Sequence, residues 1–238
     1  MSDEPYLDAL DLCRHYRRGP HVVRALDGVS LAIRRGEYIG VVGSSGSGKT
    51  TLLNLLAGLD TPTSGALKFS GRSFTSMSRR ELASYRAHNV GMIFQSFNLI
   101  SHYSALQNVE TALLFNNTSP EKRRRLSTAM LEQLGLADRL AHRPADLSGG
   151  EQQRVAVARA IVKNPEILFA DEPTGNLDYE NALQISSLMT GLNRNGLTIV
   201  LVTHNLELAQ QQSHRTIRMQ YGHLVADEAV HRPGEPGT

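Results

Sequence analysis

The sequence predicts an α/β fold in which a parallel sheet flanked by helices is interrupted by a helical lobe. Three observations lead to this prediction. Short apolar segments punctuated by glycine run from Tyr6 to Ser70, helical patterns dominate residues 96–163, and strand-like and helix-like segments alternate again from Glu166 onward. Such alternation is typical of a parallel sheet that is covered by helices.

Each expected element has its own pattern. In the first region, short apolar runs predict strands, and an apolar-rich run predicts one helix. In the lobe, apolar residues recur at helical spacing (Leu126, Met130, Leu131 and Leu134), and residues 151–162 lack glycine and proline. The expected strands are residues 7–13, 29–33, 38–42, 66–70, 91–94, 167–170 and 198–203, and the expected helices include residues 49–57, 151–162 and 181–193.

Composition limits the class of protein. The chain has 238 residues, enough for one large domain or one domain with an inserted lobe. Its 40% hydrophobic and 20% charged residues are ordinary for a globular protein. The net charge of +2 is too small to favour nucleic acid or an anionic membrane as the main partner. The single cysteine, Cys13, excludes an internal disulfide and a cysteine-rich metal site, and its simplest interpretation is a small apolar strand residue.

The sequence has neither a signal-peptide pattern at its start nor a membrane-spanning segment. The start, MSDEPYLDALDL, is acidic and lacks a basic stretch followed by an apolar run, so we expect no signal peptide. No segment reaches the about 18 uninterrupted apolar residues that a membrane-spanning helix needs. We therefore expect a soluble protein whose membrane role depends on a partner. The polar residues 231–238 are expected to form a disordered tail.

Residues 43–50 read GSSGSGKT, a complete match to the phosphate-loop pattern. A strand candidate precedes the motif and a helix candidate follows it, which is the context that the motif requires. We predict that Lys49 neutralises the β- and γ-phosphates of ATP and that the Thr50 hydroxyl binds Mg²⁺. A flexible linker, the alternative, does not explain lysine and threonine at these offsets. The nucleotide-binding residues expected here are Gly43, Ser44, Ser45, Gly46, Ser47, Gly48, Lys49, Thr50 and Thr51.

Residues 167–172 read ILFADE, an apolar strand followed by two acids. Ligands of open α/β sheets bind beyond the carboxyl ends of the strands. Asp171 is therefore predicted to hold Mg²⁺, directly or through water, and Glu172 to orient and deprotonate the attacking water. The alternative is a solvated pair that caps the next helix. A neighbouring phosphate loop makes it less favoured, because such a site needs a second, acidic metal ligand.

Residues 147–154 read LSGGEQQR, which resembles the signature motif of ABC ATPases. Ser148 offers a hydroxyl, and Gly149 and Gly150 offer unobstructed N–H groups at the start of a helix, which makes a second anion-binding helix terminus. In ABC ATPases, the signature of one subunit closes over the ATP that the other subunit's loop holds. The resemblance therefore implies a head-to-tail homodimer with two ATP molecules in its interface. The alternative is a plain helix N-cap with a glycine turn.

Further motifs of the resemblance appear in order along the chain. Gln95 matches the glutamine that senses Mg²⁺ and joins the core to the helical lobe. Residues 176–178, which end in Asp178 and lie in the string EPTGNLD, match the loop that contacts the opposite subunit. His204 matches the switch histidine that contacts the γ-phosphate. The residue after it departs from the pattern, because Asn205 stands where the family usually has aspartate, which puts the support of His204 in doubt.

Tyr16 stands where ABC ATPases stack an aromatic ring on adenine. Tyr6 and His15 are nearby alternatives for that role. The motifs that carry the resemblance run from Tyr16 to His204, which is nearly the whole chain. The resemblance thus implies an ATPase whose catalytic residues are Glu172, His204 and Lys49, with ATP and Mg²⁺ as its ligands.

Four strings narrow the resemblance to the MacB, lipoprotein-release (Lol) and FtsE group: GLDTPTSG, FQSFNLI, LSGGEQQRVAVARAIV and ADEPTGNLD. Members of this group pair with permeases that have few membrane helices and a large external domain. For this chain, the resemblance implies a permease on a separate chain. The resemblance implies a P-loop NTPase (RecA-like) core with an antiparallel β subdomain and an inserted α-helical subdomain. In this single ABC domain, residues 1–95 and 164–230 would form the core with its β subdomain, and residues 96–163 the helical subdomain. The chain would lie in the cytoplasm, peripheral to the membrane through its permease.

Two other segments are open to interpretation. The loop candidate at residues 94–104 is rich in apolar side chains (Phe97, Leu99, Ile100 and Tyr103), which indicates either a groove for a partner helix or packing between the two lobes. The resemblance favours the groove, because the coupling helix of the permease binds there in ABC ATPases. The basic run KRRR at residues 122–125 is interpreted as a solvated helix face.

Three functional hypotheses follow. The first is the ATP-hydrolysing subunit of a transporter or mechanotransmission complex. The second is a soluble ABC-type ATPase that acts on DNA or ribosomes, a class that typically has a long coiled-coil insertion or two cassettes in one chain. The third is a regulatory module without turnover, which the presence of Glu172 disfavours. We favour the first, because the helical lobe is short and the chain has one phosphate loop.

Overall fold

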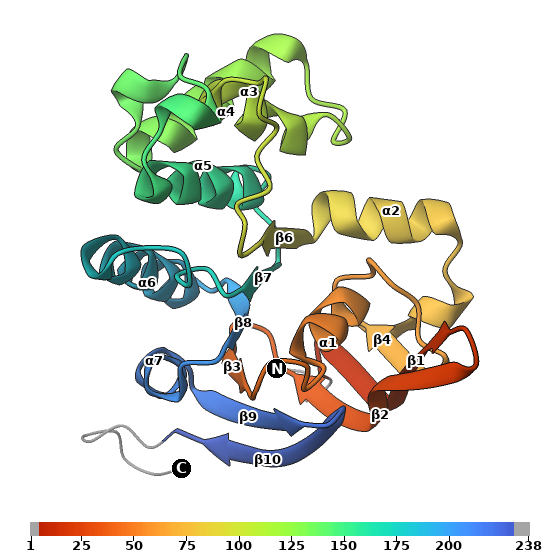
Figure 1. Ribbon diagram of the computed structural model, residues 1–238. Helices are drawn as coiled ribbons and strands as arrows, with labels where there is room; N and C mark the ends of the chain where they lie inside the picture. The colour runs from red at the N-terminus through yellow and green to blue at the C-terminus, as the bar shows by residue number, and fades with distance from the viewer. Residues whose placement is uncertain (1–4, 231–238) are drawn as a thin grey trace. The chain divides into compact units, whose positions relative to one another are not determined.

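The computed structural model describes residues 5–230, so the tail expected at residues 231–238 lies outside the described residues. The chain divides into two compact units. The first comprises Met1–Leu82 and Asn193–Thr238, and the second comprises Ala83–Leu192. The boundaries fall within α2 (Arg79–His88) and α6 (Tyr179–Arg194), so these two helices carry the chain from one unit to the other (Figure 1).

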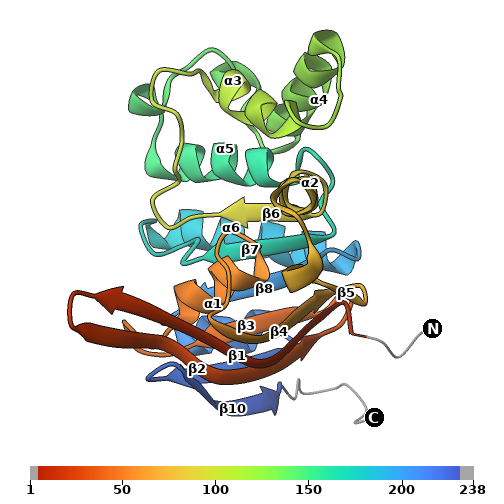
Figure 2. The same cartoon turned by 90° about the vertical axis from the view of Figure 1, so that its right-hand side faces the viewer.

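An antiparallel sheet in the first unit has the strand order β2-β1-β4-β5, and Figure 2 shows the long, curved strands β1 and β2. Its inner face buries alternate residues of β1, among them Leu7 and Ala9. The first two strands are longer than predicted. At their hairpin end, residues such as Val22 and Val23 are exposed on both faces, so the sequence there shows no alternation of buried and exposed residues that would predict a strand. The strands are β1 (Leu7–Arg18), β2 (His21–Ile33), β4 (Ser64–Phe69) and β5 (Arg72–Ser73).

Parallel strands form the centre of the first unit. In it, β3 (Tyr38–Val42) pairs in parallel with β8 (Thr198–Thr203) and with β9 (Arg215–Gln220), and β10 (His223–Ala229) pairs antiparallel to β9. Every residue of β3 and β8 is buried, which explains why β3 is apolar throughout and β8 is apolar between its two terminal threonines. The sequence interpretation missed β9 and β10. Exposed polar side chains interrupt the buried ones in β9, and every residue of β10 is exposed or only partly buried.

Two helices pack on these strands: α1 (Lys49–Leu56) contacts β8, and α7 (Leu206–Gln212) contacts β3. Close approach is possible because Gly40 of β3 faces α7, where a side-chain carbon would lie 2.8 Å from the Cβ of Ala209. The strand therefore requires glycine at this position. A short 3-10 turn, Phe74–Ser76, follows β5.

The second unit pairs two parallel strands, β6 (Val90–Ile93) and β7 (Ile167–Asp171), with a group of helices (Figure 1). Helix α5 (Gly149–Ile161) packs on β6 and on the helices α3 (Ala105–Glu110) and α4 (Pro120–Gln133). Short 3-10 turns lie at Thr111–Leu113, Ala137–Arg139 and Pro144–Asp146. The lobe predicted at residues 96–163 falls inside this unit, and its boundaries remain a prediction.

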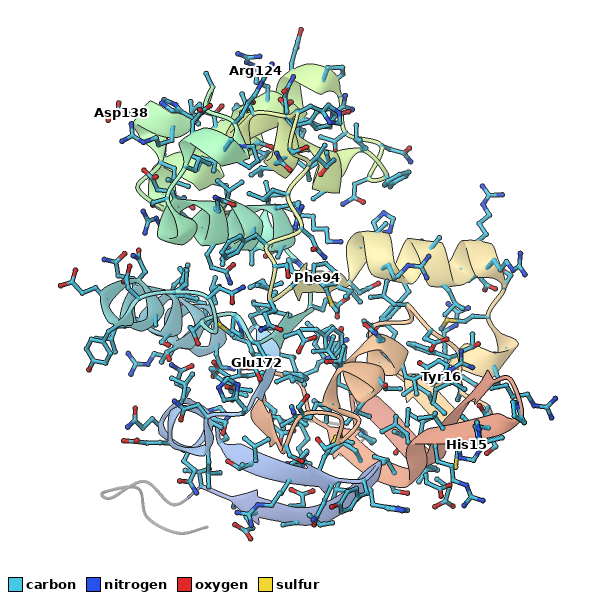
Figure 3. The ribbon with its side chains drawn as sticks, in the orientation of Figure 1. His15, Tyr16, Phe94, Arg124, Asp138 and Glu172 are labelled. Atoms are coloured by element: carbon cyan, nitrogen blue, oxygen red, sulfur yellow. The ribbon has the colours of Figure 1, made fainter. Side chains whose placement is uncertain are left out.

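The helices of the second unit share one apolar core. Of the residues predicted at helical spacing, Leu131 is fully buried and Leu126, Met130 and Leu134 pack against the core from its edge. Three of the four basic residues at positions 122–125 are exposed on α4, among them Arg124 (Figure 3), in line with a solvated helix face. Among the described residues, we find no helix whose length and apolar character would let it cross a bilayer. The buried core residues are Ala105, Leu106, Val109, Leu113, Leu131, Leu136, Leu147, Val155, Ala158 and Val162.

Candidate functional site

The phosphate-loop motif joins β3 to α1 in the first unit. Its first glycine, Gly43, has no room for a side chain, because a Cβ would overlap the carbonyl oxygen of Met219. Gly48 has a φ of 103° and begins α1, and a Cβ there would overlap the carbonyl oxygen of Ala25. Glycine is therefore required at both ends of the loop by close backbone approach as well as by backbone conformation.

Lys49 is held inside this loop. Its side chain is only 8% exposed, and its Nζ donates hydrogen bonds to the carbonyl oxygens of Gly43 at 2.8 Å and Ser44 at 2.9 Å. The ammonium group is thus fixed against the loop backbone before any ligand arrives. Such preorganisation lowers the entropy cost of binding an anion.

The N-terminus of α1 lacks the usual stabilising side chains. No side chain among the described residues caps the helix at Gly48, and the first turn contains no acidic residue. The neighbouring Ser47 hydroxyl is buried and finds no hydrogen-bond partner in the part of the chain that the structure describes. Backbone N–H groups in the first turn of a helix have no acceptor within the helix. The loop therefore has donors available, and a phosphate group fits them.

His204 lies at the same sheet edge as the phosphate loop. In the register of β3 and β8, Val42 pairs with Thr203, so Gly43 and His204 each follow one member of the same pair. His204 is exposed. The next residue, Asn205, accepts a hydrogen bond from Leu208 N at 2.9 Å and so caps α7. Asparagine and aspartate are equally good N-caps. Asn205 therefore keeps the capping role that the aspartate usual in the family would have.

Tyr16 lies on β1 in the first unit (Figure 3). Its hydroxyl donates to Asp60 at 2.8 Å, and the guanidinium of Arg14 lies 4.6 Å from its ring centre and forms an ion pair with Asp60 at 2.8 Å. The alternative Tyr6 is buried and packs edge-on against Phe69. The sequence interpretation missed Arg14 and Asp60, which are far apart in the chain and belong to no local pattern.

In the second unit, the acidic pair closes β7. Asp171 is its last residue, and Glu172 follows with a φ of 47°, a left-handed conformation that costs roughly 1–2 kcal/mol for a residue with a side chain. The backbone turns there, and Gly175 N donates to Glu172 O at 3.1 Å. Both carboxylates are half-buried. A strained residue directly after an acidic strand end is the kind of outlier that occurs at functional sites.

Gln95 lies beside the turn that contains Glu172. A Cβ placed on Gly175 would lie 3.6 Å from the Cβ of Glu172 and 3.7 Å from Nε2 of Gln95. Asn176 Nδ2 also donates to the backbone oxygen of Gln95 at 2.9 Å. The loops that follow the neighbouring strands β6 and β7 are thus joined, and the second unit brings Gln95 and the acidic turn together.

The signature segment begins α5 with a complete capping box. The Ser148 hydroxyl accepts from Glu151 N at 3.2 Å, and Glu151 accepts from Ser148 N at 2.7 Å. Arg139 donates to the same carboxylate at 2.8 Å. The hydrogen bond from Ser148 N and the one from Arg139 lower the pKa of Glu151 to about 2. Ser148 and Gly149 are exposed, whereas Gly150 is buried.

Asp178 connects its loop to the signature helix through Asn181. Asp178 accepts from Asn181 N at 2.9 Å and from Asn181 Nδ2 at 2.7 Å, and these two bonds lower the pKa of its carboxyl. The amide of Asn181 lies where a Cβ of Gly150 would be, and its oxygen accepts from Arg154 at 3.3 Å. The sequence interpretation missed Asn181 and Arg154, although the position of Arg154 at the end of the LSGGEQQR string could have drawn attention to it.

The candidate residues divide between the two units. Each unit brings its own set together. The first unit holds Tyr16, Gly43, Ser44, Ser45, Gly46, Ser47, Gly48, Lys49, Thr50, Thr51 and His204, and the second holds Gln95, Ser148, Gly149, Gly150, Asp171, Glu172 and Asp178.

A glycine-rich loop that joins a buried parallel strand to an uncapped helix defines a P-loop nucleotide-binding protein. Comparison with known proteins narrows this class. The sequence profile described as ABC transporter matches residues 26–175. The chain belongs to the ABC transporter family, and it is an ATP-hydrolysing nucleotide-binding subunit of that family.

Two relatives match nearly the full length of both chains. LolD, the lipoprotein-releasing system ATP-binding protein of Pseudomonas fluorescens, is 44% identical over 95% of this chain and 100% of its own length. An uncharacterized ABC transporter ATP-binding protein of Methanocaldococcus jannaschii is 45% identical over 92% of this chain and 97% of its own. The chain also matches 36% of the length of MacB, the macrolide export ATP-binding/permease protein of Marinobacter nauticus, at 41% identity over 98% of this chain.

A solved structure confirms the fold class. The ATP-binding cassette MJ0796, described as a dimeric post-hydrolysis state bound to ADP and Pi, superposes with a TM-score of 0.88 at 37% identity. The match covers 95% of this chain and 99% of the cassette. The resemblance to the MacB and lipoprotein-release group is confirmed by these relatives. The alternative, a soluble ABC-type ATPase with a role outside transport, is not favoured.

Proposed function

We propose that two copies of this chain bind two ATP molecules between them and that hydrolysis drives a permease carried on a separate chain. The observation that carries this proposal is that two helices each have an N-terminus suited to phosphate. Among the described residues, α1 begins beside Lys49 without a side-chain cap, and α5 begins after Ser148, which is exposed. A single chain needs only one such end to hold a triphosphate. The dimeric cassette structure supports a second copy as the source of the other end.

In this proposal, the phosphate loop binds ATP first. Lys49 and the N–H groups at the start of α1 hold the β- and γ-phosphates, and Tyr16 stacks on adenine. Thr50, Gln95 and Asp171 would hold Mg²⁺ through a hydroxyl, an amide and a carboxylate oxygen, a set of hard donors that suits this ion. Mg²⁺, when bound, neutralises charge on the phosphate oxygens.

Glu172 is the proposed general base. Its position after β7, beside Gln95, puts a carboxylate at the sheet edge where ligands of α/β folds bind. It would accept a proton from the attacking water, while His204 would donate to the γ-phosphate oxygens. A positioned base contributes about 10²–10⁴-fold to a rate.

Ser148 would act on the partner's nucleotide. Its oxygen already accepts from Glu151 N, so its own O–H remains the donor that can reach a phosphate oxygen. Gly149 and Asp178 would lie at the same interface. The closed dimer would then depend on the γ-phosphate, and hydrolysis with release of phosphate would loosen it.

The partner is proposed to be an integral membrane permease, with no nucleic acid expected, so the chain would work at the cytoplasmic face of the membrane. Residues 94–104 are the proposed docking segment. Two side chains hold its backbone: Arg159 donates to Phe97 O at 2.7 Å and Asn98 O at 2.6 Å, and Asn108 binds Ile100 N at 2.7 Å. Leu99 packs on the helical core, whereas Phe97 remains partly exposed for a partner.

The catalytic proposal is tested by Glu172→Gln, which keeps the shape of the side chain and removes the base. We expect ATP binding to persist, hydrolysis to fall about 10²–10⁴-fold, and a dimer to accumulate with ATP and Mg²⁺ on size-exclusion chromatography. Glu180→Gln, an exposed neighbour on α6, is the matched control and should behave as wild type. Unchanged turnover in Glu172→Gln would refute the role of Glu172.

The docking proposal is tested by Phe97→Asp, with Ser101→Asp as an exposed control in the same segment. Affinity capture of tagged wild-type protein from detergent-solubilised native membranes should recover one permease, identified by mass spectrometry. We expect Phe97→Asp to lose that permease and Ser101→Asp to keep it. Full recovery with Phe97→Asp would show that the segment is not the docking site.

A further inference from the structure

Three potential metal ligands lie together on the β1–β2 hairpin of the first unit: Cys13, His15 and Asp27. His15 Nε2 lies 3.1 Å from Asp27 Oδ1, and Cys13 Sγ lies 3.9 Å from the same oxygen. All three donor atoms lie within 4.8 Å of one another, and each side chain is partly exposed. The proposed function uses none of these residues.

A β-bulge creates this arrangement. Leu12 pairs with Val29 and Arg14 pairs with Leu26, so Cys13 alone faces two residues of β2, Asp27 and Gly28. Gly28 has a φ of 76°, which glycine adopts without strain. Bulges re-aim side chains, and this one turns Asp27 toward β1.

The two sets of side chains on this part of β1 have different partners. Arg14 and Tyr16 both contact Asp60, whereas Cys13 and His15 both contact Asp27. The cluster is therefore separate from the proposed adenine contact. Its ligands are also distinct from the oxygen donors proposed for Mg²⁺.

We propose that Cys13, His15 and Asp27 bind a divalent transition-metal ion, with Zn²⁺ as the best fit. A thiolate, an imidazole and a carboxylate are the three ligand types that zinc takes in proteins, and a water would complete a tetrahedron. Usual zinc bond lengths place the ligand atoms of a tetrahedral site about 3.4–3.6 Å apart. This spacing lies between the 3.1 Å from His15 Nε2 to Asp27 Oδ1 and the 3.9 Å from Cys13 Sγ to the same oxygen. Hard cations such as Mg²⁺ avoid the sulfur ligand.

Surrounding groups support two of the three ligands, Cys13 and Asp27, in the orientation that a metal needs. Gly28 N donates to Cys13 Sγ at 3.2 Å, and such a donor stabilises a thiolate. Arg24 binds Asp27 through Oδ2 at 3.2 Å, which leaves Oδ1 directed at Cys13 and His15. The competing explanation is an ordinary His15–Asp27 ion pair beside a cysteine that only packs. It accounts for two of the residues and gives no role to the sulfur.

The test is a Co²⁺ titration of the full chain without nucleotide, followed by displacement with Zn²⁺. Cobalt bound through a thiolate gives a charge-transfer absorption band in the near ultraviolet, so the readout reports the sulfur directly. We expect one Co²⁺ per chain with that band, and its loss on addition of Zn²⁺. Binding without the band, or no binding, would overturn the proposal.

Variants separate the cluster from other histidines. Cys13→Ser should abolish the band, and His15→Gln and Asp27→Asn should each weaken Co²⁺ binding at least about tenfold. His21→Gln, an exposed histidine on the same hairpin, is the control and should bind as wild type. Zn²⁺ should also raise the Tm of wild type and of the control, but not of Cys13→Ser. Equal Co²⁺ affinity in Cys13→Ser and wild type would contradict the site.

Discussion

The helices α1 and α5 both begin at glycine-rich segments proposed to bind phosphate, yet their N-termini are built in opposite ways. The start of α1 has glycine at the cap and no acid in its first turn. The start of α5 has Ser148 and Glu151, which satisfy each other's backbone N–H groups. A capping box is worth about 1 kcal/mol or more to a helix. The start of α1 therefore gains hydrogen bonds when a ligand binds, whereas the capping box already supplies them at the start of α5.

This contrast indicates a division of labour. The α1 end has no side-chain cap among the described residues and holds a fixed ammonium, so it should bind nucleotide in a single copy. The α5 end is already satisfied and offers mainly one hydroxyl hydrogen and the exposed N–H of Gly149. It should therefore add to binding only when two copies close.

Lys49→Ala should produce the largest loss. A buried ammonium that contacts phosphate contributes about 1.5–3 kcal/mol, so the affinity of a single copy for ATP should fall on the order of 10- to 150-fold. Fluorescence titration with a labelled ATP analogue measures this effect. Lys122→Ala, an exposed lysine on α4, is the control. Affinity within twofold of wild type in Lys49→Ala would remove the distinction between the two ends.

Gly150→Ala tests why the signature needs glycine. The new methyl group would overlap the amide of Asn181, so we expect a loss of about 1–3 kcal/mol in the free energy of unfolding, measured with urea. A second substitution, Asn181→Gly, removes the obstructing side chain and should restore part of this stability. Failure of the double variant to recover would mean that the glycine is required for another reason.

Ser148→Ala should separate binding from turnover. Because the proposed target of Ser148 is the nucleotide of the partner, ATP affinity of a single copy should stay within about twofold, while turnover at saturating ATP should fall about tenfold. Ser148→Thr keeps a hydroxyl and should retain most activity. Reduced ATP affinity in a dilute, single-copy sample of Ser148→Ala would place the hydroxyl at its own loop instead.

Glu151→Gln should have the smallest effect, and that effect should depend on pH. The pKa of Glu151 is lowered from 4.5 to about 2, so its stabilising contribution is present above about pH 4.5 and is lost as pH falls toward 2. Urea unfolding at pH 7 should show a loss of about 1 kcal/mol in Glu151→Gln. The gap between variant and wild type should close below pH 4.5. A gap that does not change with pH would exclude the titration of Glu151 as its cause.

The sequence was informative where local pattern and structure coincide. The phosphate loop was predictable because a buried strand, three glycines, and the lysine–threonine pair fall in one short segment. Strands β3 and β8 were predictable because burial on both faces favours apolar residues, which make up all of β3 and the four central residues of β8. The fold class followed from these elements, and the cassette structure confirms it.

The contacts that support the candidate site were not predictable in the same way. Asn181 covers Gly150, and Asp60 holds Tyr16, but in each case the two residues are distant in sequence and each is ordinary in its own surroundings. The hairpin that carries Cys13, His15 and Asp27 was only partly predicted, because its exposed end has no burial pattern. The bulge at Gly28 depends on the pairing register of two strands, which a single strand does not reveal.

The central claim is that two copies enclose the nucleotide, and sedimentation velocity of the wild-type chain tests it most directly. With a non-hydrolysable ATP analogue and Mg²⁺, the account predicts that the sedimenting mass doubles, whereas without nucleotide, or with Lys49→Ala, it stays that of one copy. A wild-type chain that binds the analogue and still sediments as a single copy would contradict the account.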